Sequence, residues 1–276
     1  MSQEETILPA GRVAGAFYRM LHEPKKWELT YWWICRAFFI YGLICTVFWM
    51  ADPTPPAFTT IVPIPEQNGA GRTFLVMLIH LLVTFLWEFF QFAKPTSAWR
   101  LIPRYFQVIS CTFALVTAFF GAFVNLYYNF YWWDTAIHFF GGALCVMLGY
   151  ELCTMIQHKQ HAAIPMPVII LCSVGMCFTV TSIWELFEFT FDQVAWGDMQ
   201  HWSLALAKEA GVVHPIFKPA PEPGAAWDAR YAIMDTMSDM VMNFLGCVAA
   251  LIALLIYPYH HKKPESNPNV LYSEHS

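Results

Sequence analysis

The sequence contains few charged residues and no basic block. Charged side chains make up 13% of its 276 residues, about half the fraction usual in soluble domains. The chain has 15 Lys and Arg and 20 Asp and Glu, so it lacks the positively charged surface that binding to a phosphate polymer requires. The composition therefore excludes a nucleic-acid-binding protein, and its high apolar content excludes a disordered chain.

A secretory signal and a disulfide framework are also missing. The eight cysteines all fall inside apolar runs, where thiols pack as small hydrophobes, so no disulfide is expected. Residues 1–30 carry charges throughout and lack the short apolar stretch and cleavage site of a signal peptide, so the first apolar run is expected to stay as an anchor. Val13, Phe17, Tyr18 and Leu21 lie near helical spacing, which is compatible with a short interfacial helix before that anchor.

What the chain does contain is long apolar runs. Its residues are 57% hydrophobic and its mean hydropathy is +0.44. A helix of about 20 apolar residues crosses the hydrocarbon core of a bilayer. The sequence therefore predicts an all-α, polytopic transmembrane helix bundle of about six spans: Tyr31 to Met50, Thr73 to Ala93, Tyr105 to Tyr127, Asp134 to Gln157, Ile164 to Asp192 and Asp235 to Tyr257.

The distribution of Lys and Arg predicts the orientation. Ten of them lie in the segments on one side of the membrane and four on the other, and cytoplasmic segments carry the excess. Residues 1–30 and the tail 258–276 are therefore expected in the cytoplasm, flanking a membrane domain over 31–257. A long loop over 193–234 is expected outside, and the whole chain is expected in a bacterial plasma membrane.

Ionisable residues inside the spans are the best guide to function, because they are costly in hydrocarbon and usually face a polar interior. Eight of the nine charged residues there are acidic. Six of the acidic residues lie near the predicted outer face of the membrane, whereas Glu88 and Glu151 lie toward the cytoplasmic ends of their spans. The nine are Arg36, Glu88, Asp134, Glu151, Glu185, Glu188, Asp192, Asp235 and Asp239.

These acids form polar stripes on three predicted helices, because residues three, four or seven apart share a helical face. The stripes consist of Asp134 with His138, of Glu185 with Glu188 and Asp192, and of Asp235 with Asp239 and Asn243. So many carboxylates in one small volume repel one another unless some are protonated or a cation lies among them.

The stripes favour a divalent cation, Mg, Mn, Ca or Zn, held by oxygen atoms and one imidazole. Glu188 or Asp192 would then serve as general acid or base. Two other readings stay open: Asp134 orients His138 rather than binding metal, and Asp134 and Asp235 simply favour helix starts. The expected metal ligands are Asp134, His138, Glu185, Asp235, Asp239 and Asn243.

The remaining unusual residues are expected to be structural. Arg36 should extend toward the cytoplasmic headgroups. Glu88 and Glu151 should make interhelix hydrogen bonds, and His80 should be a packed, hydrogen-bonded core residue. Gly141, Gly142, Gly149 and Gly246 should let helices approach closely.

Three of these segments also carry a family resemblance. Asp134 to His138, Glu185 to Glu188 and Asp239 to Gly246 resemble the motifs of the YjdF-type bacterial inner-membrane proteins and, more distantly, of the VanZ-like family. VanZ-like proteins usually have Lys and Gln where this chain has Thr135 and Glu188, so the YjdF-type resemblance is preferred. It implies a polytopic plasma-membrane protein connected with envelope lipids or glycopeptide tolerance, and it implies no particular reaction.

The leading hypothesis is a metal-dependent hydrolase or transferase that acts on a phospholipid or polyprenyl-phosphate headgroup at the outer leaflet, with membrane lipids as its partners. Arg230 with Lys208 or Lys218 would meet phosphate, and the outer loop with Trp196, His201, Trp202 and His214 would form a lid. The alternatives are a cation or proton-coupled carrier and a non-catalytic scaffold whose acids bond loop amides.

Overall fold

The structure, a computed structural model, is all-helical over the residues it describes, as the composition predicts. Those residues are 12–51, 56–59, 69–94, 97–130, 132–160, 163–195, 199–200 and 229–256. Five helical segments are long and apolar enough to cross a membrane. They are α2 (Lys26–Ala51), α5 (Arg104–Ala114) continued by the π-helical η3 (Leu115–Phe123), α7 (Trp133–Gln160), α8 (Met166–Ala195) and α10 (Ala229–Ile256).

The second predicted span is an interrupted helix. It consists of α3 (Ala70–Val83) and the short α4 (Leu86–Gln91), with a break at Thr84 and Phe85. A backbone carbonyl freed by such a break must find a donor within the protein, because hydrocarbon supplies none. The carbonyl of Thr84 accepts hydrogen bonds from Arg36, with Nη2 at 2.7 Å, and from the amide of Gln107. Side chains of α2 and α5 therefore stabilise the break.

Arg36 does not reach the headgroups, so that expectation is wrong. Its side chain is 2% exposed, pairs with Glu88 and lies 3.7 Å from the ring centroid of Phe85. The partner carboxylate is 52 positions away along the chain, and no local pattern reveals it. The expected interhelix bonds of Glu88 and Glu151 are confirmed, the latter accepting from the hydroxyl of Tyr105.

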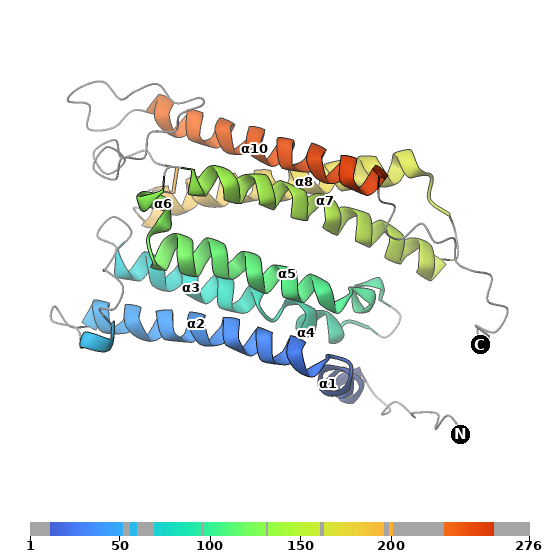
Figure 1. The fold of residues 1–276 in the computed structure, drawn as a ribbon, viewed down its shortest axis with the longest axis horizontal. Coiled ribbons are helices and arrows are strands. Elements are labelled where there is room, and N and C mark those ends of the chain that lie inside the picture. Colours follow the sequence, from blue (N-terminus) through green and yellow to red (C-terminus); the bar gives the residue numbers. More distant parts are fainter. Residues whose placement is uncertain are drawn as a thin grey trace.

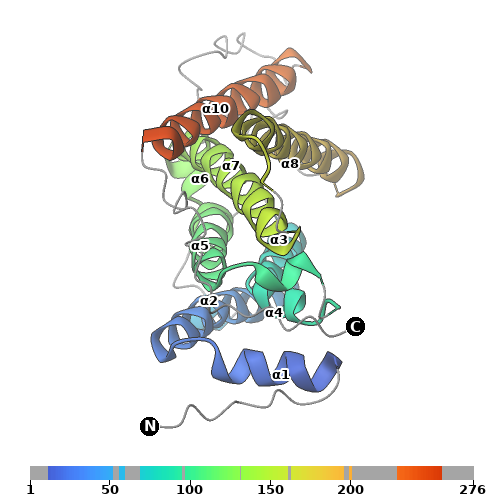
Figure 2. The same cartoon turned by 90° about the vertical axis from the view of Figure 1, so that its right-hand side faces the viewer.

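The bundle has two halves that meet along α7. One half contains α2, α3, α4, α5 and η3, and the other contains α7, α8 and α10 (Figures 1 and 2). Helix α7 packs against α8 and α10, and it contacts the first half through η3 and η2 (Ala98–Leu101). The shorter η1 (Ala57–Thr59) and α6 (Leu126–Asn129) lie in connections. All eight cysteines are free thiols, as expected.

Helix α1 (Arg12–His22) lies across the bundle axis, seen end-on in Figure 1 and lengthwise in Figure 2. Val13, Phe17 and Leu21 are 57%, 51% and 71% exposed along it. A helix with exposed apolar residues in this orientation matches the expected interfacial helix, and its location at a membrane surface stays a prediction.

Glycines bring α7 and α10 into close contact, as predicted. A Cβ atom on Gly142 would lie 1.9 Å from the carbonyl oxygen of Asn243, and one on Gly246 would lie 1.8 Å from that of Phe139. No side chain fits at such distances, so the two backbones touch. This contact places the polar residues of α10 directly against α7.

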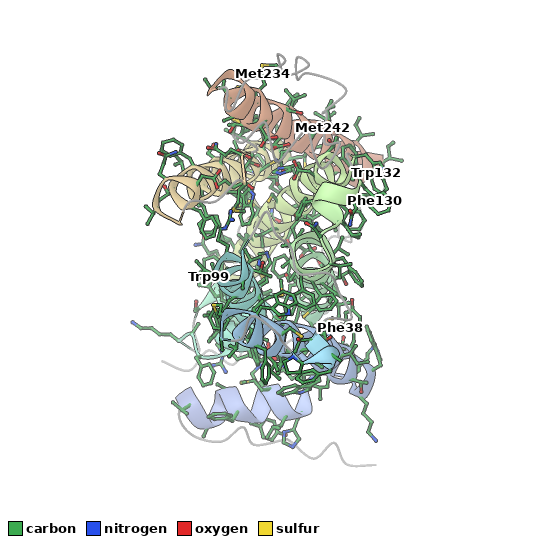
Figure 3. The ribbon with its side chains drawn as sticks, turned by 90° about the vertical axis from the view of Figure 1, so that its left-hand side faces the viewer. Phe38, Trp99, Phe130, Trp132, Met234 and Met242 are labelled. Atoms are coloured by element: carbon green, nitrogen blue, oxygen red, sulfur yellow. The ribbon has the colours of Figure 1, made fainter. Side chains whose placement is uncertain are left out.

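Large apolar side chains cover the outside of the bundle. Leu82 on α3 is 51% exposed, and Ile183 and Leu186 on α8 are 61% and 65% exposed. Aromatic residues mark the end of the bundle near α6, where Phe130 and Trp132 are both exposed (Figure 3). This arrangement is typical of a surface in contact with lipid and bounded by an aromatic belt.

Candidate functional site

The three predicted polar stripes meet at one end of the bundle. Helices α7 and α10 begin at the α6 end, and α8 ends there (Figure 1). The polar side chains project between the three helices, and we call them the carboxylate–histidine cluster. It consists of Asp134 and His138 from α7, Glu185 and Glu188 from α8, and Asp239 and Asn243 from α10, all buried except the partly exposed Asp134.

The cluster contains two groups of ligand atoms that share Asp239. Asp134, His138 and Asp239 form one group, and Glu185, Glu188 and Asp239 form the other, with the ligand atoms of each group within 4.8 Å of one another. Both carboxylate oxygens of Glu185 and the Oε2 atom of Glu188 are buried without a hydrogen bond of normal geometry, although the hydroxyl group of Thr236 lies close to Glu185. Buried carboxylates in this state are costly unless they are protonated or bind a cation. The second group, made only of oxygen donors, therefore fits a divalent cation.

Asn243 determines how His138 is protonated. The Nδ2 atom of Asn243 lies 2.9 Å from the carbonyl oxygen of Asp239, which only accepts hydrogen bonds, and 2.9 Å from the Nδ1 atom of His138. The amide nitrogen therefore donates to both, so Nδ1 is an acceptor and the Nε2 atom carries the proton. Nε2 lies 3.4 Å from Asp134 and 3.6 Å from Asp239. In this arrangement His138 offers a proton to carboxylates and has no free lone pair for a metal.

Two predicted site residues lie apart from these groups. The two carboxylate oxygens of Asp192 accept hydrogen bonds from the backbone amides of Met199 and Gln200, each at 2.9 Å. Asp192 thus stabilises the turn after α8. This is the role that the hypothesis of a non-catalytic scaffold predicts for the acidic residues. Asp235 is fully buried one turn before Asp239, and it belongs to neither group of close ligand atoms among the described residues.

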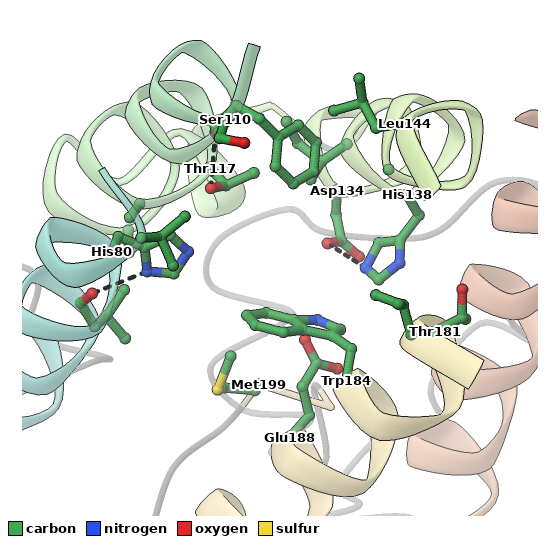
Figure 4. A pocket seen from close by; sticks show the side chains of 18 of the residues that line it. His80, Ser110, Thr117, Asp134, His138, Leu144, Thr181, Trp184, Glu188 and Met199 are labelled. Carbon is green, nitrogen blue, oxygen red and sulfur yellow. Dashed lines mark hydrogen bonds and ion pairs between the residues drawn. The ribbon is translucent and has the colours of Figure 1, made fainter. Parts of the chain in front are cut away.

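The cluster borders a cavity of about 310 Å³ between the two halves of the bundle (Figure 4). Asp134, His138 and Glu188 point into it from α7 and α8. Asn243 lines it from α10. The rest of the wall comes from α3, α5, η3, α6, α7 and α8, with Met199 after α8, and is mostly apolar. The volume lies at the lower end of the range of about 300–1,000 Å³ that is usual for ligand sites.

Sequence spacing does not predict that several other residues line the cavity. Arg72 and His80 line the cavity from α3, and Trp184 lines it from α8. His80 has the hydrogen bond expected of a packed histidine, with Nδ1 2.9 Å from the carbonyl oxygen of Val76, yet it also borders the cavity. Only the arrangement of helices from distant parts of the chain brings these residues to one wall.

Tyr127 is a further residue that the sequence does not reveal. It lies after η3, where a Cβ atom on Gly121 would come within 2.3 Å of its ring, and it lines the cavity. Loss of hydration and the negative charges of nearby carboxylates, Asp134 first among them, raise its pKa well above the usual value. The hydroxyl group of Tyr127 therefore stays protonated at neutral pH.

Some expected features lie outside the described residues. These are the lid residues Trp196, His201, Trp202 and His214, the phosphate-binding candidates Lys208 and Lys218, the side chain of Arg230, and the tail 258–276.

The fold and cluster define a polytopic membrane protein with a buried carboxylate–histidine site. Residues 95–261 match the family described as predicted membrane protein (DUF2238), and because they make up more than half of the chain, the protein belongs to this family. An uncharacterized protein of Thermotoga maritima is 20% identical over 197 residues, which cover 71% of this chain and 85% of the relative. No solved structure matches the chain.

Proposed function

We propose that the protein is a metal-dependent membrane enzyme, a hydrolase or transferase, that acts on the headgroup of a phospholipid or polyprenyl phosphate. The observation that carries this proposal is the pair of buried carboxylates, Glu185 and Glu188, whose oxygens without hydrogen bonds of normal geometry lie beside Asp239 next to the cavity. Mutual repulsion makes this arrangement costly unless the carboxylates are protonated or a positive charge lies among their oxygens, and we propose the second case. A divalent ion bound there would polarise a phosphoryl oxygen and activate water.

The residues around this position have separate roles in the proposal. Glu185, Glu188 and Asp239 would hold Mg²⁺, Mn²⁺ or Ca²⁺, which prefer oxygen ligands. Zn²⁺ would also require an imidazole lone pair, which His138 does not offer in this arrangement. The Nε2–H group of the neutral His138 ring would donate a hydrogen bond to a phosphoryl oxygen and keep its proton, and the carboxylate of Asp134 would orient the ring. Asn243 holds the ring in place. Asp235 and Asp192 support this arrangement from outside the groups of close ligand atoms.

The position of the cluster supports a headgroup as the substrate. It lies within the first turns of α7 and the last turns of α8, close to the exposed aromatic residues at that end of the bundle. Arg72, at the start of α3, lines the same cavity and supplies a positive charge for a phosphate. The excess of Lys and Arg in the other segments supports an outer-face location for this end, and we propose a bacterial plasma membrane as the setting. The resemblance of the same three motifs to YjdF-type proteins agrees with that location.

Metal binding tests the proposal directly. Purified protein is equilibrated in turn with Mg²⁺, Mn²⁺, Ca²⁺ and Zn²⁺, separated from free metal and submitted to elemental analysis. Wild-type protein should retain one of these ions, and Glu185→Gln and Asp239→Asn should lose most of it. Glu151→Gln is the matched control, because this acid lies on α7 away from the cluster and bonds to Tyr105. Wild-type protein that retains none of the four ions would overturn the proposal.

A carrier is the second candidate, and the interrupted α3 favours it. Broken helices with charged partners at membrane depth are a feature of transporters, and Arg36 pairs with Glu88 beside this break. Uptake of labelled cations or protons into proteoliposomes, abolished by both Glu88→Gln and Glu185→Gln, would support the carrier. Absence of both uptake and bound metal would leave the scaffold reading.

A further inference from the structure

We infer that the cavity binds the apolar chain of a single-chain lipid phosphate, which enters from the bilayer between α3 and α8. The inference rests on the proposed function and names its substrate class. The cavity lies inside a membrane-spanning bundle and is lined mainly by apolar side chains, with the carboxylate–histidine cluster at one end. Its volume of about 310 Å³ suits one chain better than the paired chains of a diacyl lipid.

The cavity is elongated along the helices. On α7 its lining residues extend from Asp134 to Leu148, a rise of about 21 Å, and on α3 from Arg72 to Val83, a rise of about 16 Å. Because these helices run along the bundle axis, the cavity runs in the direction that a lipid chain takes in a bilayer.

The wall of the cavity changes from charged to apolar along this length. Arg72, Asp134 and Glu188 lie at the α6 end, whereas Val83, Phe106 and Leu148 lie toward the other end. An amphiphile matches such a wall when its polar group lies beside the cluster and its chain extends away from it. Arg72 then contributes a positive charge near the phosphate in addition to the ion held by the carboxylates.

The proposed lateral entrance lies between α3 and α8. Helix α3 packs against α2, α5 and η3, and α8 packs against α7 and α10. Across the space between α3 and α8, the ring of His80 meets the edge of Trp184 at a centroid distance of 6.3 Å. Both helices also expose large apolar residues to lipid, among them Leu82 and Ile183. A chain can therefore move from the bilayer into the cavity by displacing the ring of Trp184.

Photolabelling tests the occupant. The full-length protein is reconstituted in vesicles that contain a long-chain alkyl phosphate with a mid-chain diazirine, and labelled positions are mapped by mass spectrometry. Label is expected on the cavity residues Val83, Phe106 and Leu148. Ser110→Phe fills the middle of the cavity and should reduce that label about tenfold. Leu171→Phe, the matched control, adds the same ring at a lipid-facing position of α8 away from the cavity and should leave the label unchanged.

A separate variant tests the proposed entrance. Trp184→Ala should speed the appearance of label in the cavity severalfold, whereas Trp132→Ala, at the exposed end of the bundle, should not. Label confined to lipid-facing positions, label unaffected by Ser110→Phe, or equal competition from a diacyl phosphatidic acid would each overturn the inference.

Metal retention, measured on the same samples, separates this inference from the proposed function. Ser110→Phe protein that keeps its metal is folded, so loss of cavity label in it supports the chain site. A wild-type protein that binds metal but shows no cavity label overturns the chain site alone. Cavity label in a protein that binds none of the four metals supports the chain site and overturns the enzyme.

Discussion

At the scale of single residues, Asn243 has the most specific effect on the site. Its amide donates to the Nδ1 atom of His138 and so keeps the proton on Nε2. A carboxylate at this position would instead accept a hydrogen bond from a protonated Nδ1, and the Nε2 atom would then present a lone pair to a metal.

We therefore expect Asn243→Asp to increase the affinity for Zn²⁺ by about 10–100-fold, the usual size of such effects. Competition against a chelator with a known zinc affinity measures this change. Asn243→Leu, which removes the hydrogen bond without adding an acceptor, is the control and should not gain affinity. Equal zinc affinity in the two variants would contradict the assigned proton position.

The raised pKa of Tyr127 predicts that the stability of the protein decreases at alkaline pH. Its pKa in the folded protein is raised above the unfolded value of about 10, so the folded state keeps a proton that the unfolded chain releases. The resulting stabilisation is fully present below about pH 10 and is lost as the pH rises through the raised pKa. The Tm curves of the wild-type protein and Tyr127→Phe should therefore be parallel below about pH 10, and above it the wild-type Tm should fall more steeply. Tm curves that stay parallel at higher pH would show that Tyr127 does not titrate in this way.

The sequence predicts the residues of the carboxylate–histidine cluster, but it does not predict the other residues that line the cavity. Spacing of three and four residues identifies Asp134 with His138, Glu185 with Glu188, and Asp239 with Asn243, because one helix turn determines these relations. Arg72 and Tyr127 reach the cavity only through the packing of helices that are distant in sequence. The direction of hydrogen bonds at His138 also depends on a side chain 105 positions away.

At the scale of helices, the contact of α7 with α10 determines the geometry of the cluster. A Cβ atom on Gly246 has no room beside Phe139, whereas one on Gly175 has no atom within 4 Å. Gly246→Ala should destabilise the protein by about 1–3 kcal/mol and weaken metal binding, because α10 must move away from α7.

Gly175→Ala is the matched control on α8 and should be neutral or slightly stabilising. Thermal unfolding in detergent with the preferred metal present and absent measures both effects. Equal stability of the two variants would show that α7 and α10 separate without cost.

The length of the apolar runs predicts where the helices lie, but it does not predict where a helix breaks or becomes π-helical. Each predicted span corresponds to helical structure with similar bounds, because about 20 apolar residues have no other regular conformation in hydrocarbon. The break at Thr84 and the π-helical segment η3 leave no comparable trace. Both depend on side chains from neighbouring helices, as the bonds of Arg36 and Gln107 to the Thr84 carbonyl illustrate.

At the scale of the whole molecule, the location of the site depends on the orientation in the membrane. Trp132 lies at the α6 end, and Gln160 lies at the end of α7 that is away from it. In intact cells, a membrane-impermeant thiol reagent should label Trp132→Cys and should not label Gln160→Cys. Wild-type protein is the control, because all eight native cysteines lie within predicted spans. Labelling of Gln160→Cys alone would place the site on the cytoplasmic side.

The boundaries of the family match divide the cavity wall into two parts. The matched residues, 95–261, include the whole carboxylate–histidine cluster, whereas the α3 wall with Arg72 and His80 lies before them. Changes in α3 can therefore alter the length or width of the space beside the cluster without touching its carboxylates. Under the proposed function, the α3 wall would determine which substrates fit beside the cluster, and exchanging α3 between two family members would transfer that preference.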